Sequence, residues 1–235
     1  MTEDDVPGDV GADTDEPEQR GGLKAFVREV AIVLTLSLVI ASLVRVLLVQ
    51  AFLIPSGSME DTLLVGDRVL VSKVSYRFGE IERGDVVVFG DPAQWLPPNA
   101  ADNGGVGGAV ESFFEFVGVL PDDSEGHLIK RVIGLGGDTV ACCDDAGRLT
   151  VNGVSVEESE YLYPGDDPSL TEFSETVPEG QLWVMGDHRS NSGDSRIHGT
   201  VSEDEVVGRA FAVVWPLSRW DALSRTDEFD DVPAP

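Results

Sequence analysis

An uncharged apolar run near the N-terminus limits what this chain can fold into. The run from Val30 to Val44 reads VAIVLTLSLVIASLV, and the apolar character resumes after Arg45 as VLLVQAFLI. A helix that crosses a bilayer core needs about 20 such residues, and residues 25–50 supply them. Arg28 and Arg45 lie near the ends, where long basic side chains can reach the headgroups. We therefore predict a single transmembrane helix that acts as an uncleaved signal anchor.

Two other interpretations of this run are weaker. A buried helix of a soluble core normally keeps a polar face, which this run lacks. A cleaved secretory signal would end at an A-x-A-like site before a soluble start, and no such site follows. Arg20, Lys24 and Arg28 precede the run, so the positive-inside rule predicts a cytoplasmic N-terminus and an extracytoplasmic remainder in the cell membrane.

The charge balance excludes one class of partner. The chain carries 16 Lys and Arg against 43 Asp and Glu, a net charge of −27. Nucleic-acid binding needs clustered positive charge, so we expect no nucleic-acid partner. Both ends are acidic and poor in large apolar residues, and we predict disordered acidic tails over residues 1–22, on the cytoplasmic side, and over residues 221–235.

Residues 51–220 alternate short β-rich runs with turn signals, which predicts a mostly β fold. Asn152-Gly153 between alternating residues is typical of a type I′ hairpin. The predicted strands are RVLVSKV from Arg68, DVVVF from Asp85, HLIKRVIGL from His127, DTVACC from Asp138, RLTV and VSV around Asn152-Gly153, QLWVMGD from Gln181 and VVGRAFAVVW from Val206.

A Gly- and Pro-rich insertion at 92–126 interrupts this pattern and contains the apolar patch ESFFEFVGVL. Phe113, Phe114 and Phe116 could form a second membrane contact, and simple packing beneath the loop explains them equally well.

Cys142 and Cys143 are adjacent and are the two cysteines of the chain. A zinc site would need more ligands, and the three histidines are distant in sequence, so we expect no metal and no other cofactor. A vicinal disulfide would be strained, and free thiols are the favoured prediction.

Three polar clusters contain the side chains that could catalyse a reaction. They are PSGSM at 55–59, IKRVIGLGGD at 129–138 inside a predicted strand, and GDHRSNSGDSR at 186–196. Each alone is also typical of a turn, a solvent-facing strand or a hydrogen-bonded loop. They occur in this order after a membrane segment, together with RGDVVVF at 83–89.

In this combination the chain resembles bacterial signal peptidase I, a family of membrane serine endopeptidases with a Ser/Lys dyad, over roughly residues 25–217. The resemblance implies an extracytoplasmic antiparallel β-sheet catalytic domain that removes N-terminal signal peptides after Ala-x-Ala-like sites. The implied partners are signal peptides of secreted preproteins, the lipid bilayer and nearby protein-export machinery. Asp61 departs from the family pattern, which often has Pro there.

The resemblance assigns the nucleophile to Ser58 and the general base to Lys130. A serine hydroxyl needs a base to take its proton, and a lysine amine can do so when its pKa is lowered. Lowering that pKa from about 10.4 to about 7–8 corresponds to roughly 4 kcal/mol of preference for the neutral amine. The apolar neighbours of Lys130 in its strand can supply the desolvation that this shift requires.

The same resemblance implies roles for other residues. Ser56 would join the Ser58 backbone N–H in stabilising the oxyanion, and Ser192 would orient the lysine ammonium. Structural support is implied for Arg131, Asp187, Asp194 and Arg196. Shallow substrate pockets are implied for Phe52, Ile54, Pro55, Met59, Leu63, Leu128 and Ile129.

Rival functions remain at this point. A Ser–His–Asp protease could use His127, His188 or His198 as its base. Repressor autoproteases also use a Ser/Lys dyad, but they carry a DNA-binding helix-turn-helix where this chain has a membrane segment. From a different class, the chain could be a catalytically inert, membrane-tethered β module that binds peptides.

Overall fold

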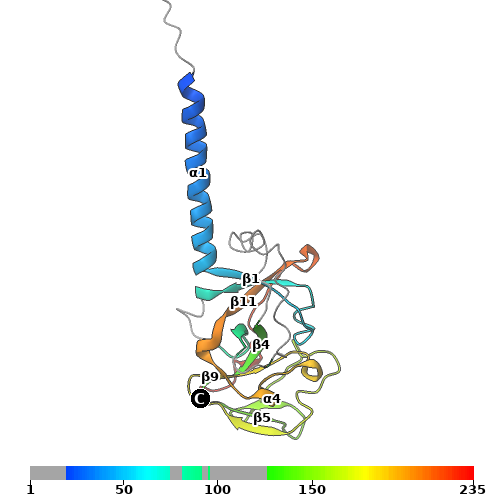
Figure 1. Ribbon diagram of the computed structural model, residues 1–235. Helices are drawn as coiled ribbons and strands as arrows, with labels where there is room; N and C mark the ends of the chain where they lie inside the picture. Colours follow the sequence, from blue (N-terminus) through cyan, green and yellow to red (C-terminus); the bar gives the residue numbers. More distant parts are fainter. Residues whose placement is uncertain (1–19, 75–80, 92–94, 96–125) are drawn as a thin grey trace, which may run out of the picture. The chain divides into compact units, whose positions relative to one another are not determined.

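The computed structural model describes residues 20–74, 81–91, 95 and 126–235. The chain forms two units, one ending at Ile40 and one running from Ala41 to Pro235 (Figure 1). The described elements are one long helix, two antiparallel β-sheets and several short helical turns.

Helix α1 (Arg20–Leu47) contains the predicted apolar run. It begins inside the tail that we predicted over 1–22, so that prediction is wrong for the last three residues, and residues 1–19 lie outside the described part. Its segment Lys24–Ser42 is long and apolar enough to cross a membrane by length and composition, at about 28 Å. None of this segment is buried in the structure, and Val33 and Leu34 are 62% and 65% exposed, which argues against a soluble core helix.

The larger sheet has, within the described residues, eight strands in the order β1-β2-β11-β3-β4-β9-β10, with β12 paired to β11. Its neighbouring strands all pair antiparallel. The strands are β1 (Val49–Leu53), β2 (Arg68–Ser72), β3 (Val86–Gly90), β4 (His127–Gly134), β9 (Gln181–Met185), β10 (Val201–Ser202), β11 (Val206–Trp215) and β12 (Asp221–Ala222).

Both faces of this sheet are covered. Successive side chains of a strand point to opposite faces, and on β3 Val86 and Val88 join one buried cluster while Val87 and Phe89 join another. Such double coverage explains why β3 is apolar throughout instead of alternating with polar residues. The central strands β3 and β4 are therefore shielded from solvent and can hold a polar side chain in a fixed position.

The smaller sheet has, within the same residues, the order β7-β6-β5-β8. Asn152 and Gly153 both have positive φ, 53° and 77°, as a type I′ turn requires, so the predicted hairpin is confirmed. Its strands are β5 (Thr139–Cys142), β6 (Leu149–Val151), β7 (Val154–Ser155) and β8 (Phe173–Thr176). The mostly β, antiparallel fold class is confirmed.

The C-terminal segment corrects one prediction. Residues 221–235, which we expected to be disordered, pack onto the domain with Phe229 3% and Val232 7% exposed. Arg83 donates to the carbonyl oxygens of Val232 at 3.3 Å and Pro233 at 3.0 Å. The prediction of disorder rested on the high acidic content of this segment and overlooked its two buried apolar residues. The domain therefore continues past its predicted end at residue 220.

Two other predictions concern the edges of the domain. The insertion at 92–126, with Phe113, Phe114 and Phe116, lies outside the described residues apart from Trp95 and Gly126. Cys142 and Cys143 are joined as a vicinal disulfide, so the prediction of free thiols is wrong in this structure.

Candidate active site

The loop between β1 and β2 carries Ser58. Backbone hydrogen bonds between its ends, from Ile54 N to Asp67 O and from Gly66 N to Ile54 O, each 2.9 Å, close the loop. Met59 and Leu63 anchor it from inside, since both are fully buried. Ser58 itself is only 6% exposed, so its hydroxyl is held at the domain interior and not on a mobile surface turn.

Lys130 reaches this loop from the middle of β4. The strand is hydrogen-bonded on both sides, to β3 and to β9, which fixes the backbone of Lys130 opposite Val87. Its Nζ lies 2.6 Å from Ser58 Oγ and 3.1 Å from the carbonyl oxygen of Ile129. The structure thus brings together the two residues that the family resemblance assigned as nucleophile and base.

The environment of Lys130 favours its neutral form. Burial lowers the pKa of Lys130 to about 8, because the ammonium loses its water there. The charges of Asp194 and Asp187 oppose this shift, and that of Arg196 adds to it. A neutral amine at hydrogen-bond distance from a hydroxyl can accept its proton, so the pair is chemically competent to activate a serine nucleophile.

Asp194 and Arg196 brace the loop that follows β9. Asp194 caps the short helix α4 (Ser195–His198) and pairs with Arg196 at 2.8 Å, and it accepts a hydrogen bond from Gly186 N at 3.0 Å. Burial alone would raise the pKa of Asp194, but its bonds and proximity to Arg196 hold that pKa below the usual value. These contacts are consistent with the support role expected for both residues.

Ser192, on the same loop, makes fewer polar contacts than Asp194. It is buried at 9% exposure, but its Oγ makes no hydrogen bond of ordinary geometry to any residue in the described part of the chain. Its closeness to Asp194 helps to lower the pKa of that carboxyl. The expected hydrogen bond from Ser192 to Lys130 is therefore not formed here. Ser56, the other expected hydroxyl, is exposed two residues before Ser58.

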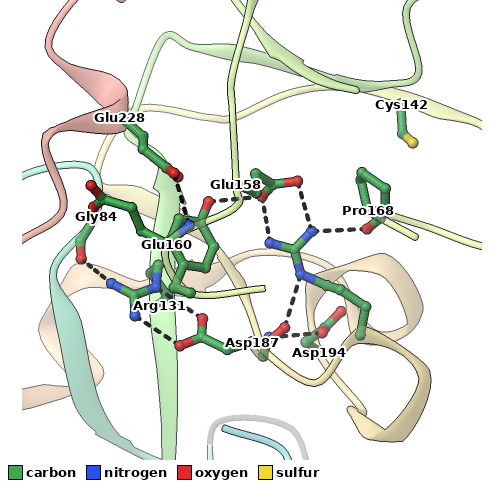
Figure 2. Close-up of polar contacts among 12 residues, drawn as sticks. Gly84, Arg131, Cys142, Glu158, Glu160, Pro168, Asp187, Asp194 and Glu228 are labelled. Atoms are coloured by element: carbon green, nitrogen blue, oxygen red, sulfur yellow. Dashed lines mark hydrogen bonds and ion pairs between the residues drawn. The ribbon is translucent and has the colours of Figure 1, made fainter. Parts of the chain in front are cut away.

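A second ion pair ties the nucleophile loop to the sheet. Arg131 and Asp187 form a buried bidentate pair at 2.9 and 2.7 Å, and Arg131 also donates to Gly84 O at 2.8 Å (Figure 2). Thr62, in the Ser58 loop, donates to Asp187 at 2.6 Å. Sequence reasoning missed Thr62, whose only signal is its position just after the PSGSM motif.

Another missed pair lies next to these residues. Arg189 and Glu158 are both at least 95% buried, and the Arg189 guanidinium contacts both carboxylate oxygens of Glu158, at 2.5 and 3.2 Å. Arg189 also donates to Gly186 O at 2.9 Å, in the loop that follows β9. Burial opposes the charge of Arg189, but Glu158 raises its pKa above the ordinary value. Glu158 lies outside every recognised motif, so no local pattern pointed to it.

A pocket lies between the end of β1 and strand β4, and neither Ser58 nor Lys130 is in its lining. It is lined by Phe52, Leu53, Ile54, Pro55, Val88, His127, Leu128 and Ile129. Five of the residues expected to bind substrate are in this lining. Met59 and Leu63 were also expected in the pocket. Both are fully buried in the apolar core, where they anchor the loop that carries Ser58.

The loop also explains a departure from the family pattern. Asp61 has φ of 88°, in the left-handed region. Proline cannot adopt this value, because its ring holds φ near −65°. Asp tolerates the conformation better than most residues, so this loop accepts Asp61 where the resemblance led us to expect proline.

The histidines do not form a catalytic triad with Ser58. All three are described, and none hydrogen-bonds Ser58 Oγ, whose side-chain partner is Lys130. His127 lines the pocket, and His198 is exposed and stacks on Trp95. His188 contacts Glu60 and Gly57 instead. The geometry therefore favours the Ser/Lys prediction over the Ser–His–Asp one.

An antiparallel β domain that holds a buried serine hydroxyl against a lysine amine of lowered pKa has the make-up of a serine hydrolase with a lysine base. Comparisons with known proteins identify the family. Residues 27–215 match the family described as "Signal peptidase, peptidase S26". The chain belongs to this family of serine endopeptidases.

The matched relatives bear the same name. Signal peptidase I of Mycobacterium tuberculosis is 41% identical, over 90% of this chain and 80% of the relative. The probable signal peptidase I of Mycobacterium leprae is 40% identical, over 88% and 81%. A crystal structure of a signal peptidase I from Enterococcus faecalis aligns at 25% identity with a TM-score of 0.36, over 55% of this chain and 96% of that one.

Proposed function

We propose that this chain removes signal peptides from exported preproteins, with Ser58 as nucleophile and Lys130 as general base. The observation that carries the proposal is the 2.6 Å contact between Lys130 Nζ and Ser58 Oγ in a site where burial lowers the pKa of Lys130 to about 8. The names of the relatives support the substrate class.

The proposed reaction follows from this contact. Neutral Lys130 takes the proton of Ser58 while Oγ bonds to the scissile carbonyl carbon, whose oxygen becomes an oxyanion. The Ser58 backbone N–H and the Ser56 hydroxyl stabilise that oxyanion. Lys130 then gives the proton to the leaving amine as the C–N bond breaks. A water, deprotonated by Lys130, hydrolyses the acyl-enzyme ester and restores Ser58.

The pocket between the end of β1 and strand β4 supports a preference for small apolar side chains. Its lining is almost wholly apolar, and Ile54, Leu128 and Ile129 contribute branched side chains to it. We infer that it accepts alanine near the scissile bond, with an extended substrate whose alternate side chains are read, as in Ala-x-Ala.

We further propose that α1 anchors the enzyme in the cell membrane, with a cytoplasmic N-terminus, an extracytoplasmic peptidase domain, and protein-export machinery nearby. The apolar, uncovered Lys24–Ser42 segment supports the anchor, and the preceding basic residues support the orientation. Protease added to right-side-out membrane vesicles should digest the domain and spare an N-terminal tag. Digestion of the tag alone would contradict this orientation.

The activity is tested with purified full-length chain in detergent micelles and a preprotein that carries an Ala-x-Ala site. Mass spectrometry of the products should show one cut directly after the second alanine, and replacement of that alanine by leucine should abolish it. Ser58→Ala and Lys130→Met, which keep the size of the site while removing the reactive atoms, should be inactive. Cleavage by Ser58→Ala would contradict the proposal, and no cleavage by the unmodified chain would favour the inert peptide-binding module.

A further inference from the structure

His188 packs directly against the loop that carries the nucleophile. Its backbone N–H donates to Ser58 O at 3.1 Å. Its ring Nδ1 lies 3.2 Å from Gly57 O and 3.0 Å from Glu60 Oε2. The same ring stacks face to face on Tyr163, with centroids 3.9 Å apart and planes 11° from parallel. One residue outside the dyad thus contacts the main chain on both sides of Ser58.

The neighbours of Nδ1 determine where its proton lies. A carbonyl oxygen and a carboxylate only accept hydrogen bonds, so Nδ1 must carry a hydrogen to be satisfied between Gly57 O and Glu60. The hydrogen can be shared between these two acceptors. Gly57 O also accepts from Glu60 N at 3.1 Å, so this carbonyl is held by two donors.

Peptide planarity links this contact to the chemistry. The Gly57 carbonyl and the Ser58 N–H belong to one peptide unit, and its planarity makes their directions opposite. A donor that fixes Gly57 O therefore fixes the direction of the Ser58 N–H, which is the proposed oxyanion donor. A hydrogen bond to a carbonyl also polarises its peptide unit and strengthens the N–H as a donor.

The stack on Tyr163 keeps the His188 ring in place. Tyr163 is itself tied to the loop after β9, because its backbone N–H donates to Asp187 O at 3.0 Å. Its carbonyl accepts from Asp166 N at 3.0 Å, and the Asp166 carboxylate accepts from Ser190 N at 2.9 Å. His188 is only about 15% exposed in its side chain, so the ring has one well-defined position.

We propose that His188 is a positioning residue that aims the Ser58 N–H at the developing oxyanion. The inference rests on the proposed function, since it requires Ser58 to be the nucleophile. Because His188 acts on the oxyanion donor and not on the base, its loss should weaken binding of the tetrahedral state while leaving binding of the substrate unchanged.

The test compares His188→Ala, His188→Asn and a matched control, His198→Ala, which removes an exposed histidine that stacks on Trp95 and does not hydrogen-bond Ser58. Assays use a fluorogenic Ala-x-Ala peptide at about pH 9, where Lys130 is mostly neutral, with rates expressed per titrated active site. A peptide aldehyde, whose hemiacetal with Ser58 places an oxygen in the oxyanion site, measures tetrahedral-state binding.

We expect His188→Ala to lower kcat about tenfold, less than the about 10²–10³ for loss of a whole oxyanion donor. KM should not change, and the aldehyde Ki should rise by the same factor as kcat falls. His188→Asn should recover most of the rate, because its amide N–H can occupy the place of Nδ1, and His198→Ala should match the unmodified enzyme.

Three results would overturn the inference: unchanged kcat in His188→Ala, a change in KM without a change in the aldehyde Ki, or an Asn variant as slow as the Ala variant. Ser58→Ala, assayed in parallel, separates this failure from that of the proposed function. Inactive Ser58→Ala with fully active His188→Ala refutes only the role of His188, whereas active Ser58→Ala refutes the dyad itself.

Discussion

Acidification should switch off the enzyme through Lys130 alone. Burial lowers the pKa of Lys130 from 10.5 to about 8, a preference for the neutral amine of about 3 kcal/mol. Only the neutral amine can take the proton of Ser58. At pH 8 about half of the enzyme is competent, at pH 7 about a tenth, and at pH 6 about a hundredth. The logarithm of kcat/KM should therefore rise with unit slope from pH 6 to 7 and level off above pH 9.

The assay measures kcat/KM for an Ala-x-Ala peptide between pH 6 and 10, with far-UV circular dichroism at each pH to confirm folding. Asp194→Asn is the informative variant, because the Asp194 charge raises the pKa of Lys130, so its loss should move the midpoint to lower pH. A midpoint near 10.5, or a rate independent of pH below 8, would refute the assignment of a desolvated lysine as the base.

Three further predictions concern stability. Asp187→Asn should lower the free energy of unfolding by about 3–5 kcal/mol in urea titrations, because it leaves the buried charge of Arg131 without its counter-charge; a change under 1 kcal/mol would show that the pair is dispensable. Deleting residues 226–235 should lower the free energy of unfolding by about 4 kcal/mol, since it removes the buried side chains of Phe229 and Val232 and exposes the apolar surface that they cover. An unchanged urea midpoint would contradict the packing of this segment. Burial raises the pKa of Glu228 from 4.5 to about 7, so the folded state binds the proton of this carboxyl more tightly than the unfolded state does. The folded state therefore loses stability as the pH rises from about 4.5 through 7. Glu228→Gln should therefore raise Tm more at pH 8 than at pH 4, and equal shifts at both would contradict this linkage.

The parts of the fold that local patterns control could be predicted from sequence. The strands β2, β3, β4, β9 and β11 and the Asn152-Gly153 hairpin all follow from β-branched runs and turn residues, which act over a few positions. The pairing of Ser58 with Lys130 came from the family resemblance. Composition could not have brought together two residues that lie 72 positions apart.

The contacts that local patterns do not encode were missed. Thr62 and Glu158 become functional neighbours only through Asp187 and Arg189, which the loop after β9 brings to them. The C-terminal segment was misjudged because its acidic average outweighed Phe229 and Val232, whose burial depends on a distant partner surface. In each instance the deciding interaction is long-range, and no window of sequence contains both partners.

The dyad is tested most directly by the site and rate of its acylation. A peptide carrying an activated ester is mixed with the enzyme at about pH 9, and the acylated residue is located by peptide mass spectrometry. The account predicts one acyl group on Ser58, none in Ser58→Ala, and acylation slowed by about 10²-fold or more in Lys130→Met. An acyl group on another residue, or an undiminished rate in Lys130→Met, would contradict the claim that Lys130 activates Ser58.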